Sequence, residues 1–314
     1  MSLAFTFPGQ GSQAVGMGKD LAENLTSARL VFEEVNDALG QNLSKLMFEG
    51  PEADLTLTEN AQPALMAVSL AVVRALEVDF GVKLQDKAAY VAGHSLGEYS
   101  ALAAAGALSL SDTARLLKRR GQAMQRAVPV GQGAMAALLG MDLEPAKAVA
   151  AEAAQGEVCA TANDNGPGQV VISGHKAAVE RAIEIAKGKG ARRAVLLPVS
   201  APFHCPLMQP AADEMAEALS KITLKPPLAP LVANVTAKAE RDPETIRRLL
   251  VEQVTGMVRW RESVLYMAGE GVDTLVELGA GKVLSGLAKR IGEGLQGVAA
   301  GTVVELESLA KSFS

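Results

Sequence analysis

The chain has 314 residues, of which 49% are hydrophobic and 21% are charged, and its net charge is −5. This length and composition are typical of a globular protein with about two domains, and the acidic balance excludes a general attraction to nucleic acid or anionic membranes. The longest apolar run, residues 64–73, is stopped by Arg74 and is far shorter than the ~18 residues of a membrane span. No basic and apolar leader precedes Pro8, so we expect a cytoplasmic protein. In that compartment we expect Cys159 and Cys205 to be buried free thiols.

The N-terminal sequence FTFPGQGSQA, residues 5–14, joins a strand-like stretch to a glycine-rich turn. The turn matches the G-x-G-x-x-G/A pattern of dinucleotide-binding proteins, which also place an acidic residue at the end of a second strand about 20 residues further on. Here the apolar residues of the segment 28–39 have helical spacing, so Glu33 and Glu34 lie within an amphipathic helix. The pattern therefore disfavours a dinucleotide site, and the turn needs another function.

The sequence AAYVAGHSLGEYSALAAAG carries the strongest chemical signal of the chain. A strand-like stretch leads into GHSLG, residues 93–97, and then directly into an alanine-rich helix. This G-x-S-x-G pattern is typical of a nucleophile elbow, a tight strand-to-helix turn that exposes the Oγ of Ser95 at the edge of a sheet. The backbone N–H of Leu96 and the positive helix terminus would then face an oxyanion at the same place. The alternative is that Ser95 only caps the helix.

The next helical stretch, residues 111–127, is rich in arginine and lysine, which would ordinarily form a solvated basic face. Arg120 is the exception, because its neighbours three and four positions away are leucine, alanine and methionine. Its side chain therefore points with the apolar stripe toward the core. A buried guanidinium needs an anion, which is either a substrate carboxylate or an internal Asp or Glu.

Residues 127–199 read as strand, helix, strand, strand, helix and strand, the order of a ferredoxin-like α+β unit. Residues 1–126 and 200–314 alternate short apolar strand candidates with amphipathic helices, which is typical of an α/β fold with a mostly parallel sheet. The strand candidates are residues 3–7, 88–95, 228–234 and 272–278. We predict a larger hydrolase-like α/β domain into which the ferredoxin-like subdomain is inserted, with an active site between the two.

The chain has three histidines that could act as the base for a serine nucleophile. His94 adjoins Ser95 on a strand end, so its side chain points to the opposite face, and His175 begins a helix of the small subdomain. His204 lies in a proline-bracketed segment where the chain returns from the inserted unit, a setting that often places functional groups. Elimination favours His204 as the base, although a structural role is also open.

Several segments together resemble the malonyl-coenzyme A:acyl carrier protein transacylase family, and the likeness runs almost from end to end. They are FPGQGSQ at 7–13, AQPAL at 61–65, GHSLGEYSAL at 93–102, RG at 120–121, NDNGPGQVVISG at 163–174, APFHCPLM at 201–208 and QVTGMVRW at 253–260. The separations from Ser95 to Arg120 and to His204 are typical of the family. Any one segment could be chance, but their shared order identifies the chain as similar to this family.

The resemblance implies that Ser95 is the acylated nucleophile, His204 its base and Arg120 the group that binds the malonyl carboxylate. The same likeness implies that the N–H groups of Gln10 and Leu96 form the oxyanion hole and that a carbonyl at Gln253 orients the base. It also implies that Asn165 lies near the site and that Phe203 crowds the α-carbon of the acyl group. Malonyl-CoA would be the substrate and acyl carrier protein the acceptor. The family needs no metal or other cofactor, and we expect a monomer that acts in fatty acid or polyketide synthesis.

Two other functions remain open. A serine esterase or thioesterase shares the G-x-S-x-G elbow on an α/β scaffold, but it does not require an inward Arg120, and no convincing Asp precedes a C-terminal His. A non-catalytic subunit that binds carrier protein would not need the complete set of Ser95, His204 and Arg120. Transfer to a pantetheine thiol in preference to water distinguishes the three.

Overall fold

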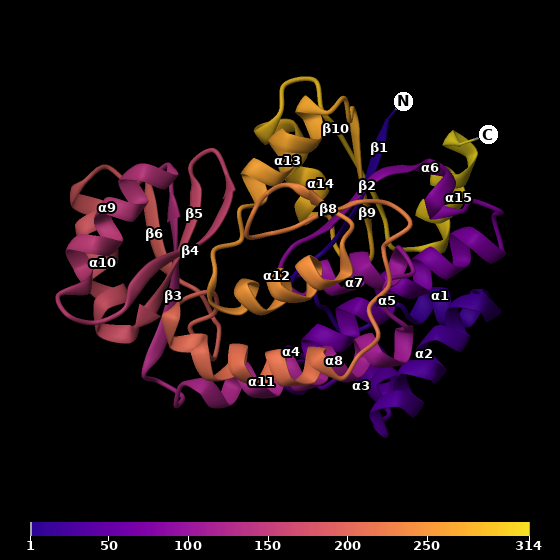
Figure 1. Ribbon diagram of the computed structural model, residues 1–314, viewed down its shortest axis with the longest axis horizontal. Helices are drawn as coiled ribbons and strands as arrows, with labels where there is room; N and C mark the ends of the chain where they lie inside the picture. Colours follow the sequence, from indigo (N-terminus) through magenta and orange to yellow (C-terminus); the bar gives the residue numbers. More distant parts are fainter. Residues whose placement is uncertain (1, 314) are drawn as a thin grey trace.

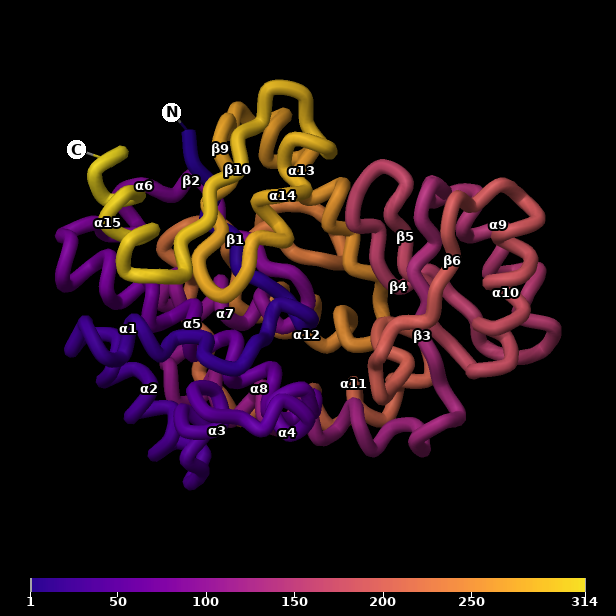
Figure 2. Tube along the Cα trace, turned by 180° about the vertical axis from the view of Figure 1, so that it is seen from behind, coloured from indigo at the N-terminus to yellow at the C-terminus, as the bar shows by residue number. Residues whose placement is uncertain are grey.

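The computed structural model describes residues 2–313, which form two bodies joined side by side (Figure 1). The larger body contains a six-stranded sheet, and the smaller contains a four-stranded sheet. Both chain termini lie at the end of the large body that is remote from the small one (Figures 1 and 2). The predicted α/β fold with an inserted ferredoxin-like unit is confirmed.

The large sheet has the strand order β10-β9-β1-β2-β7-β8. Its strands are β1 (Leu3–Phe7), β2 (Ala88–Gly93), β7 (Leu231–Val232), β8 (Ala239–Glu240), β9 (Thr274–Leu278) and β10 (Gln296–Ala300). All neighbours are parallel except β7 and β8, which pair antiparallel. Four strands were predicted. The sequence gives little sign of β8, which has two residues, or of β10, whose QGVAA sequence has few of the β-branched and aromatic residues that favour strands.

Helices cover both faces of this sheet. Alternate residues of its strands are therefore buried in two separate cores. Phe5 and Val91 belong to the larger core, and Ala4 and Ala92 belong to the smaller one beneath α13 and α14. The helices of the large body are α1 (Lys19–Asn24), α2 (Thr26–Leu39), α3 (Leu43–Glu49), α4 (Glu52–Thr56), α5 (Thr58–Val78), α6 (Leu84–Lys87), α7 (Gly97–Ala104), α8 (Leu110–Ala127), α11 (Gln209–Ser220), α12 (Pro243–Thr255), α13 (Trp260–Gly269), α14 (Val283–Ile291) and α15 (Val303–Ser312), with a 3-10 turn at Pro206–Met208.

Helix α5 is long and apolar enough to cross a membrane, and it is the one such helix within residues 2–313. However, 78% of its apolar window is buried inside the protein. It therefore serves as the central core helix of the large body, where it packs against α2 and α8.

The small body follows the predicted order of six elements. Strands β3 (Gly133–Leu139), β4 (Cys159–Gly166), β5 (Gln169–His175) and β6 (Arg193–Leu196) form an antiparallel sheet of order β4-β5-β3-β6. Helices α9 (Leu143–Ala154) and α10 (Lys176–Gly188) pack on this sheet over an apolar core. A parallel bridge between Asn163 and Val258 joins β4 of the small body to the segment before α13 of the large body.

Candidate active site

The nucleophile elbow, residues 93–97, forms as the glycine pattern predicts, between β2 and α7. Ser95 has a φ of 53°, a left-handed conformation that is unfavourable for a residue with a side chain. A Cβ on Gly93 would lie 1.9 Å from the carbonyl carbon of Gly97, and a Cβ on Gly97 would lie 2.2 Å from the carbonyl oxygen of Phe7. Only glycine fits at either position, and the turn holds Ser95 at the carboxyl end of the parallel sheet.

Ser95 and His204 form a hydrogen-bonded pair, with 2.8 Å between the serine Oγ and the histidine Nε2. On its other side the histidine Nδ1 lies 2.9 Å from the carbonyl oxygen of Gln253 and 3.1 Å from that of Gly256. Two carbonyl acceptors assign the proton to Nδ1, so Nε2 presents its lone pair to the serine hydroxyl. Burial, followed by the charge of Arg120, lowers the pKa of His204 to about 3, which keeps the imidazole neutral and able to accept a proton.

Arg120 is buried beside this pair, with 1% of its surface exposed, as its apolar helical neighbours predict. Its Nη1 donates to the Oε1 of Gln62 at 2.8 Å, and its Nη2 donates to the Oε1 of Gln253 at 2.8 Å and to the Oγ of Ser95 at 3.1 Å. The guanidinium also lies 5.7 Å from the centre of the Tyr99 ring. Within residues 2–313 no carboxylate oxygen lies within 4.0 Å of it, which argues against the internal ion pair considered above.

Two backbone N–H groups beside Ser95 are free to bind an oxyanion. Gln10 and Leu96 line the same cavity as Ser95, and no acceptor in residues 2–313 pairs with either N–H. The side-chain amide of Gln10 is bonded elsewhere, because its Nε2 donates to the Oγ1 of Thr58 at 3.1 Å. The glycine-rich turn thus offers its backbone rather than this side chain, although the oxyanion-hole role stays a prediction.

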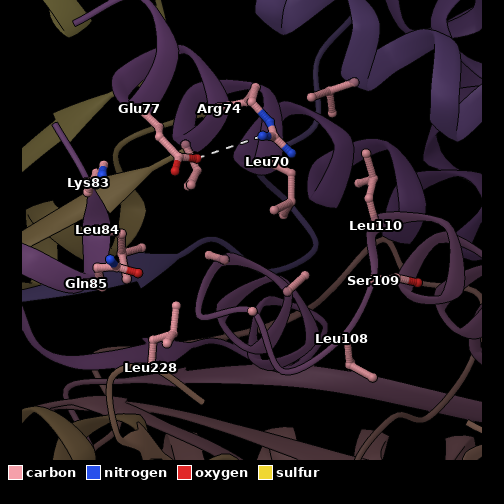
Figure 3. Close-up of a pocket in the computed structure, with 15 residues that line it drawn as sticks. Leu70, Arg74, Glu77, Lys83, Leu84, Gln85, Leu108, Ser109, Leu110 and Leu228 are labelled. Atoms are coloured by element: carbon pink, nitrogen blue, oxygen red, sulfur yellow. Dashed lines mark ion pairs between the residues drawn. The ribbon is translucent and has the colours of Figure 1, made fainter. Parts of the chain in front are cut away.

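The site opens into a cavity of about 490 Å³ between the two bodies, within the range of small-molecule sites. The large body contributes the reactive residues, with Phe203 and Met124 nearby. The small body contributes side walls formed by Met135, Asn163, Leu197, Pro198 and Val199. A second cavity, of about 330 Å³, lies against the C-terminal half of α5 and contains none of the predicted site residues (Figure 3).

Asn165 lies near the site but is absent from the lining of the active-site cavity, where Asn163 stands instead. The Oδ1 of Asn165 lies 2.8 Å from the Nε2 of His94, and the His94 ring packs 5.9 Å from that of Trp260. The prediction that the His94 side chain points to the opposite face from Ser95 is wrong, because both residues line the same cavity. His175 remains in the small body, where its Nδ1 accepts from the backbone N–H of Val158 at 2.9 Å.

Three buried polar side chains hold the elbow; the sequence did not single out Asn234 or Glu98, and it singled out Gln253 only for its backbone carbonyl. The Oδ1 of Asn234 accepts from the N–H of Ser95 at 2.8 Å, and the Nε2 of Gln253 donates to the Ser95 carbonyl at 2.9 Å. The same Nε2 donates to the Oε2 of Glu98 at 2.7 Å. Burial raises the pKa of Glu98 to about 7. Together these bonds fix the strained backbone of the nucleophile from both sides.

Sequence signals for the missed residues were present but indirect. Gln62 and Glu98 lie inside the segments AQPAL and GHSLGEYSAL, but no local pattern marks either of them as a site residue. Asn234 follows β7, which lies next to β2 in the sheet. A polar residue at the carboxyl end of a neighbouring parallel strand is a reasonable site candidate, because these ends meet at one edge.

A strained serine paired with a neutral histidine, on an α/β framework, is typical of enzymes that work through an acyl-serine. A family model described as acyl transferase domain matches residues 4–306. The chain belongs to this family, and within it to the malonyl CoA-acyl carrier protein transacylases, as the resemblance of its sequence motifs indicated.

Individual relatives match almost the whole chain. The malonyl CoA-acyl carrier protein transacylase of Escherichia coli K12 is 49% identical over 92% of each chain, and that of Bacillus subtilis 168 is 47% identical over 95% of this chain and 92% of its own. The crystal structure of an acyl-carrier-protein-S-malonyltransferase from Bartonella henselae superposes with a TM-score of 0.97 at 57% identity, covering 99% of each chain. A malonyl-transacylase solved in complex with its type II PKS acyl-carrier protein gives a TM-score of 0.96 at 44% identity, covering 99% of this chain and 100% of the other.

Proposed function

We propose that the protein transfers the malonyl group from malonyl-CoA to the phosphopantetheine thiol of acyl carrier protein, through a malonyl ester on Ser95. The observation that carries this proposal is Arg120, a buried cation without a carboxylate partner in residues 2–313, whose Nη2 lies 3.1 Å from the nucleophile. Malonyl is an acyl group with a free carboxylate, which a guanidinium binds bidentately. The names of the close relatives, and the solved complex with a carrier protein, support the same substrate and acceptor.

In the first half-reaction the Oγ of Ser95 attacks the thioester carbonyl while its proton passes to the Nε2 of His204. The negative charge that develops on the carbonyl oxygen is held by the N–H groups of Gln10 and Leu96. When the tetrahedral intermediate collapses, the bond to sulfur breaks, and the coenzyme A thiolate takes the proton back from His204. The malonyl group is then an ester on Ser95.

In the second half-reaction the phosphopantetheine thiol gives its proton to the neutral His204 and attacks the ester. The Ser95 oxygen then leaves and recovers the proton, and malonyl-carrier protein is released. The enzyme is thus ping-pong, because coenzyme A departs before the carrier protein reacts. We expect no metal or redox cofactor to be needed, because His204 carries the proton, two backbone N–H groups bind the oxyanion and Arg120 binds the malonyl carboxylate.

The proposal includes a monomeric protein in the cytoplasm. A monomer is supported because every residue given a role, from Gln10 to Gln253, comes from one chain and lines or adjoins one cavity. Coenzyme A thioesters and carrier proteins as substrates fit a cytoplasmic location.

Arg120→Ala tests the proposal. Transfer to holo carrier protein is measured with malonyl-CoA and with acetyl-CoA, and the variant should lose about 10²-fold in malonyl transfer while acetyl transfer changes far less, because only malonyl carries the second carboxylate. Equal losses for both acyl groups would contradict the proposed role of Arg120.

A serine thioesterase is the main alternative, and the products of the same assay identify it. The transacylase should convert malonyl-CoA to malonyl-carrier protein with little free malonate. Free malonate as the main product, with holo carrier protein present, would favour the hydrolase.

A further inference from the structure

Arg120 is held by uncharged oxygens. Its Nη1 donates to the side-chain carbonyl of Gln62, and its Nη2 donates to that of Gln253, each at 2.8 Å. Both glutamines are buried, with 1% and 0% of their surface exposed. Proteins usually place Asp or Glu beside a buried arginine, because a paired charge costs less to bury. The use of two amides therefore needs an explanation.

The backbone brings Gln62 to Arg120 through a close approach of two helices. Gly121 of α8 packs against the start of α5, where an added Cβ would lie 2.6 Å from the Cα of Glu59 and 2.7 Å from the carbonyl oxygen of Thr58. Any larger residue at this position would separate the helices. Arg120 and Gln62 are therefore fixed on facing helices, and the bond between them is not an accident of a mobile side chain.

The neighbours of each glutamine determine which way its amide points. The Nε2 of Gln253 donates to the Oε2 of Glu98 and to the carbonyl of Ser95, so its Oε1 must face Arg120. The Nε2 of Gln62 lies 3.7 Å from the Sδ of Met124, which leaves its Oε1 toward the guanidinium. Glu98 belongs to the same buried network and acts on Arg120 through its charge, but its only hydrogen-bonded link to the guanidinium is the Gln253 amide, and burial raises its pKa to about 7 and so favours the neutral acid.

We propose that Gln62 and Gln253 are positioning residues that aim Arg120 without neutralising it, so that its positive charge remains available for the free carboxylate of the acyl substrate. A carboxylate in either place would form a permanent ion pair with the guanidinium. Substrate would then have to displace this pair, and the preference for a carboxylate-bearing acyl group would be lost. This inference rests on the proposed malonyl transfer and identifies what makes it selective.

The test is Gln62→Glu, which keeps the shape and the hydrogen-bond acceptor and adds one negative charge at the Nη1 of Arg120. The kcat/KM for transfer to holo carrier protein is measured with malonyl-CoA and acetyl-CoA, and their ratio is compared with that of the wild type. The ratio should fall about 10- to 100-fold, the size of the effect of a charge-assisted hydrogen bond. Because both rates come from the same sample, the ratio does not depend on the fraction of protein that is folded.

Two matched variants separate neutralisation from other effects. Gln13→Glu adds the same charge to the wall of the same cavity but away from the Arg120 bonds, and it should lower the ratio much less. Gln62→Leu removes the acceptor without adding charge, and it should reduce the ratio less than Gln62→Glu. If Gln13→Glu or Gln62→Leu lowers the ratio as much as Gln62→Glu, general repulsion or lost positioning explains the effect and the proposal is wrong.

Other outcomes also decide the question. A wild-type ratio retained by Gln62→Glu, when Arg120→Ala loses it, overturns the inference but leaves the malonyl transfer intact. A wild type that does not prefer malonyl would instead contradict the proposed function itself. Should Gln62→Glu yield no folded protein, Gln62→Asp places a shorter carboxylate on the same side of Arg120 and should also lower the ratio.

Discussion

The two bodies differ in how their buried polar side chains are connected. In the large body, Arg120, Gln253, Asn234 and Glu98 are buried together and bond to one another or to Ser95. In the small body, the core between the sheet and its two helices is apolar, and the ion pairs lie on the surface. Burying polar groups costs stability unless each is paired, and the network around Ser95 meets this requirement at the reaction centre. The comparison indicates that one body performs the chemistry and that the other shapes the cavity.

The largest effect should come from His204 of the large body, for which His175 of the small body is the comparison. His204→Ala should slow acylation of Ser95 by malonyl-CoA about 10²- to 10⁴-fold, the usual contribution of a general base. His175→Ala, in the small body, removes only an acceptor for a backbone N–H and should leave the rate close to that of the wild type. Rapid-quench mass spectrometry measures both. Equal losses would contradict the division between the bodies.

The glycine-rich turn of the large body gives the next effect. Gln10→Pro removes the backbone N–H and should reduce turnover about 10²- to 10³-fold, whereas Gln10→Ala keeps this donor and should cost little. KM should change less than kcat, because the donor meets charge that develops only in the transition state. Thermal melting must first show that the proline variant is folded. A folded proline variant with wild-type turnover, beside an inactive alanine variant, would assign the role to the side chain.

The cavity walls should affect the choice of acyl group rather than the rate of chemistry. Phe203→Ser should improve the use of methylmalonyl-CoA relative to malonyl-CoA by about tenfold, because one methyl group in an apolar pocket is worth about 1–3 kcal/mol. Met135→Ala, in the wall from the small body, should also change acyl selectivity while the rate of malonyl transfer falls little. Competition assays measure the ratio, and an unchanged ratio in both variants would contradict the role of these walls.

The smallest effect on turnover is expected for Glu98→Gln, which instead changes how stability depends on pH. The pKa of Glu98 is raised to about 7 in the folded protein from the usual 4.5, so the folded state holds this proton more tightly than the unfolded state. The contribution of Glu98 to stability is therefore full below pH 4.5 and is lost as the pH rises through 7. Melting temperatures of the wild type relative to Glu98→Gln should fall by a few degrees between pH 5 and pH 8. A constant difference would show that Glu98 is ionised throughout.

Local patterns predicted the parts of the site that lie within single segments. The two glycines around Ser95 determine the elbow, and apolar neighbours on α8 determine the burial of Arg120. Both follow from geometry within one turn or one helix. The order of strands and helices likewise predicted the inserted subdomain.

Contacts between distant segments could not be predicted in the same way. Asn234 bonds to Ser95 across 139 residues of sequence, and no local pattern shows which amide will be opposite the nucleophile. Asn165 was implied by the family resemblance and not by a local pattern. In the structure Asn163 lines the cavity, and Asn165 lies beside it and bonds to His94.

The most direct test of the central claim is intact-protein mass spectrometry after mixing with malonyl-CoA, followed by holo carrier protein. The account predicts one malonyl adduct on Ser95, its loss when carrier protein is added, and the appearance of malonyl-carrier protein in the same amount. Ser95→Ala should carry no adduct, since its elbow has no nucleophile. An adduct on the alanine variant, or an adduct that is lost only to water, would contradict the account.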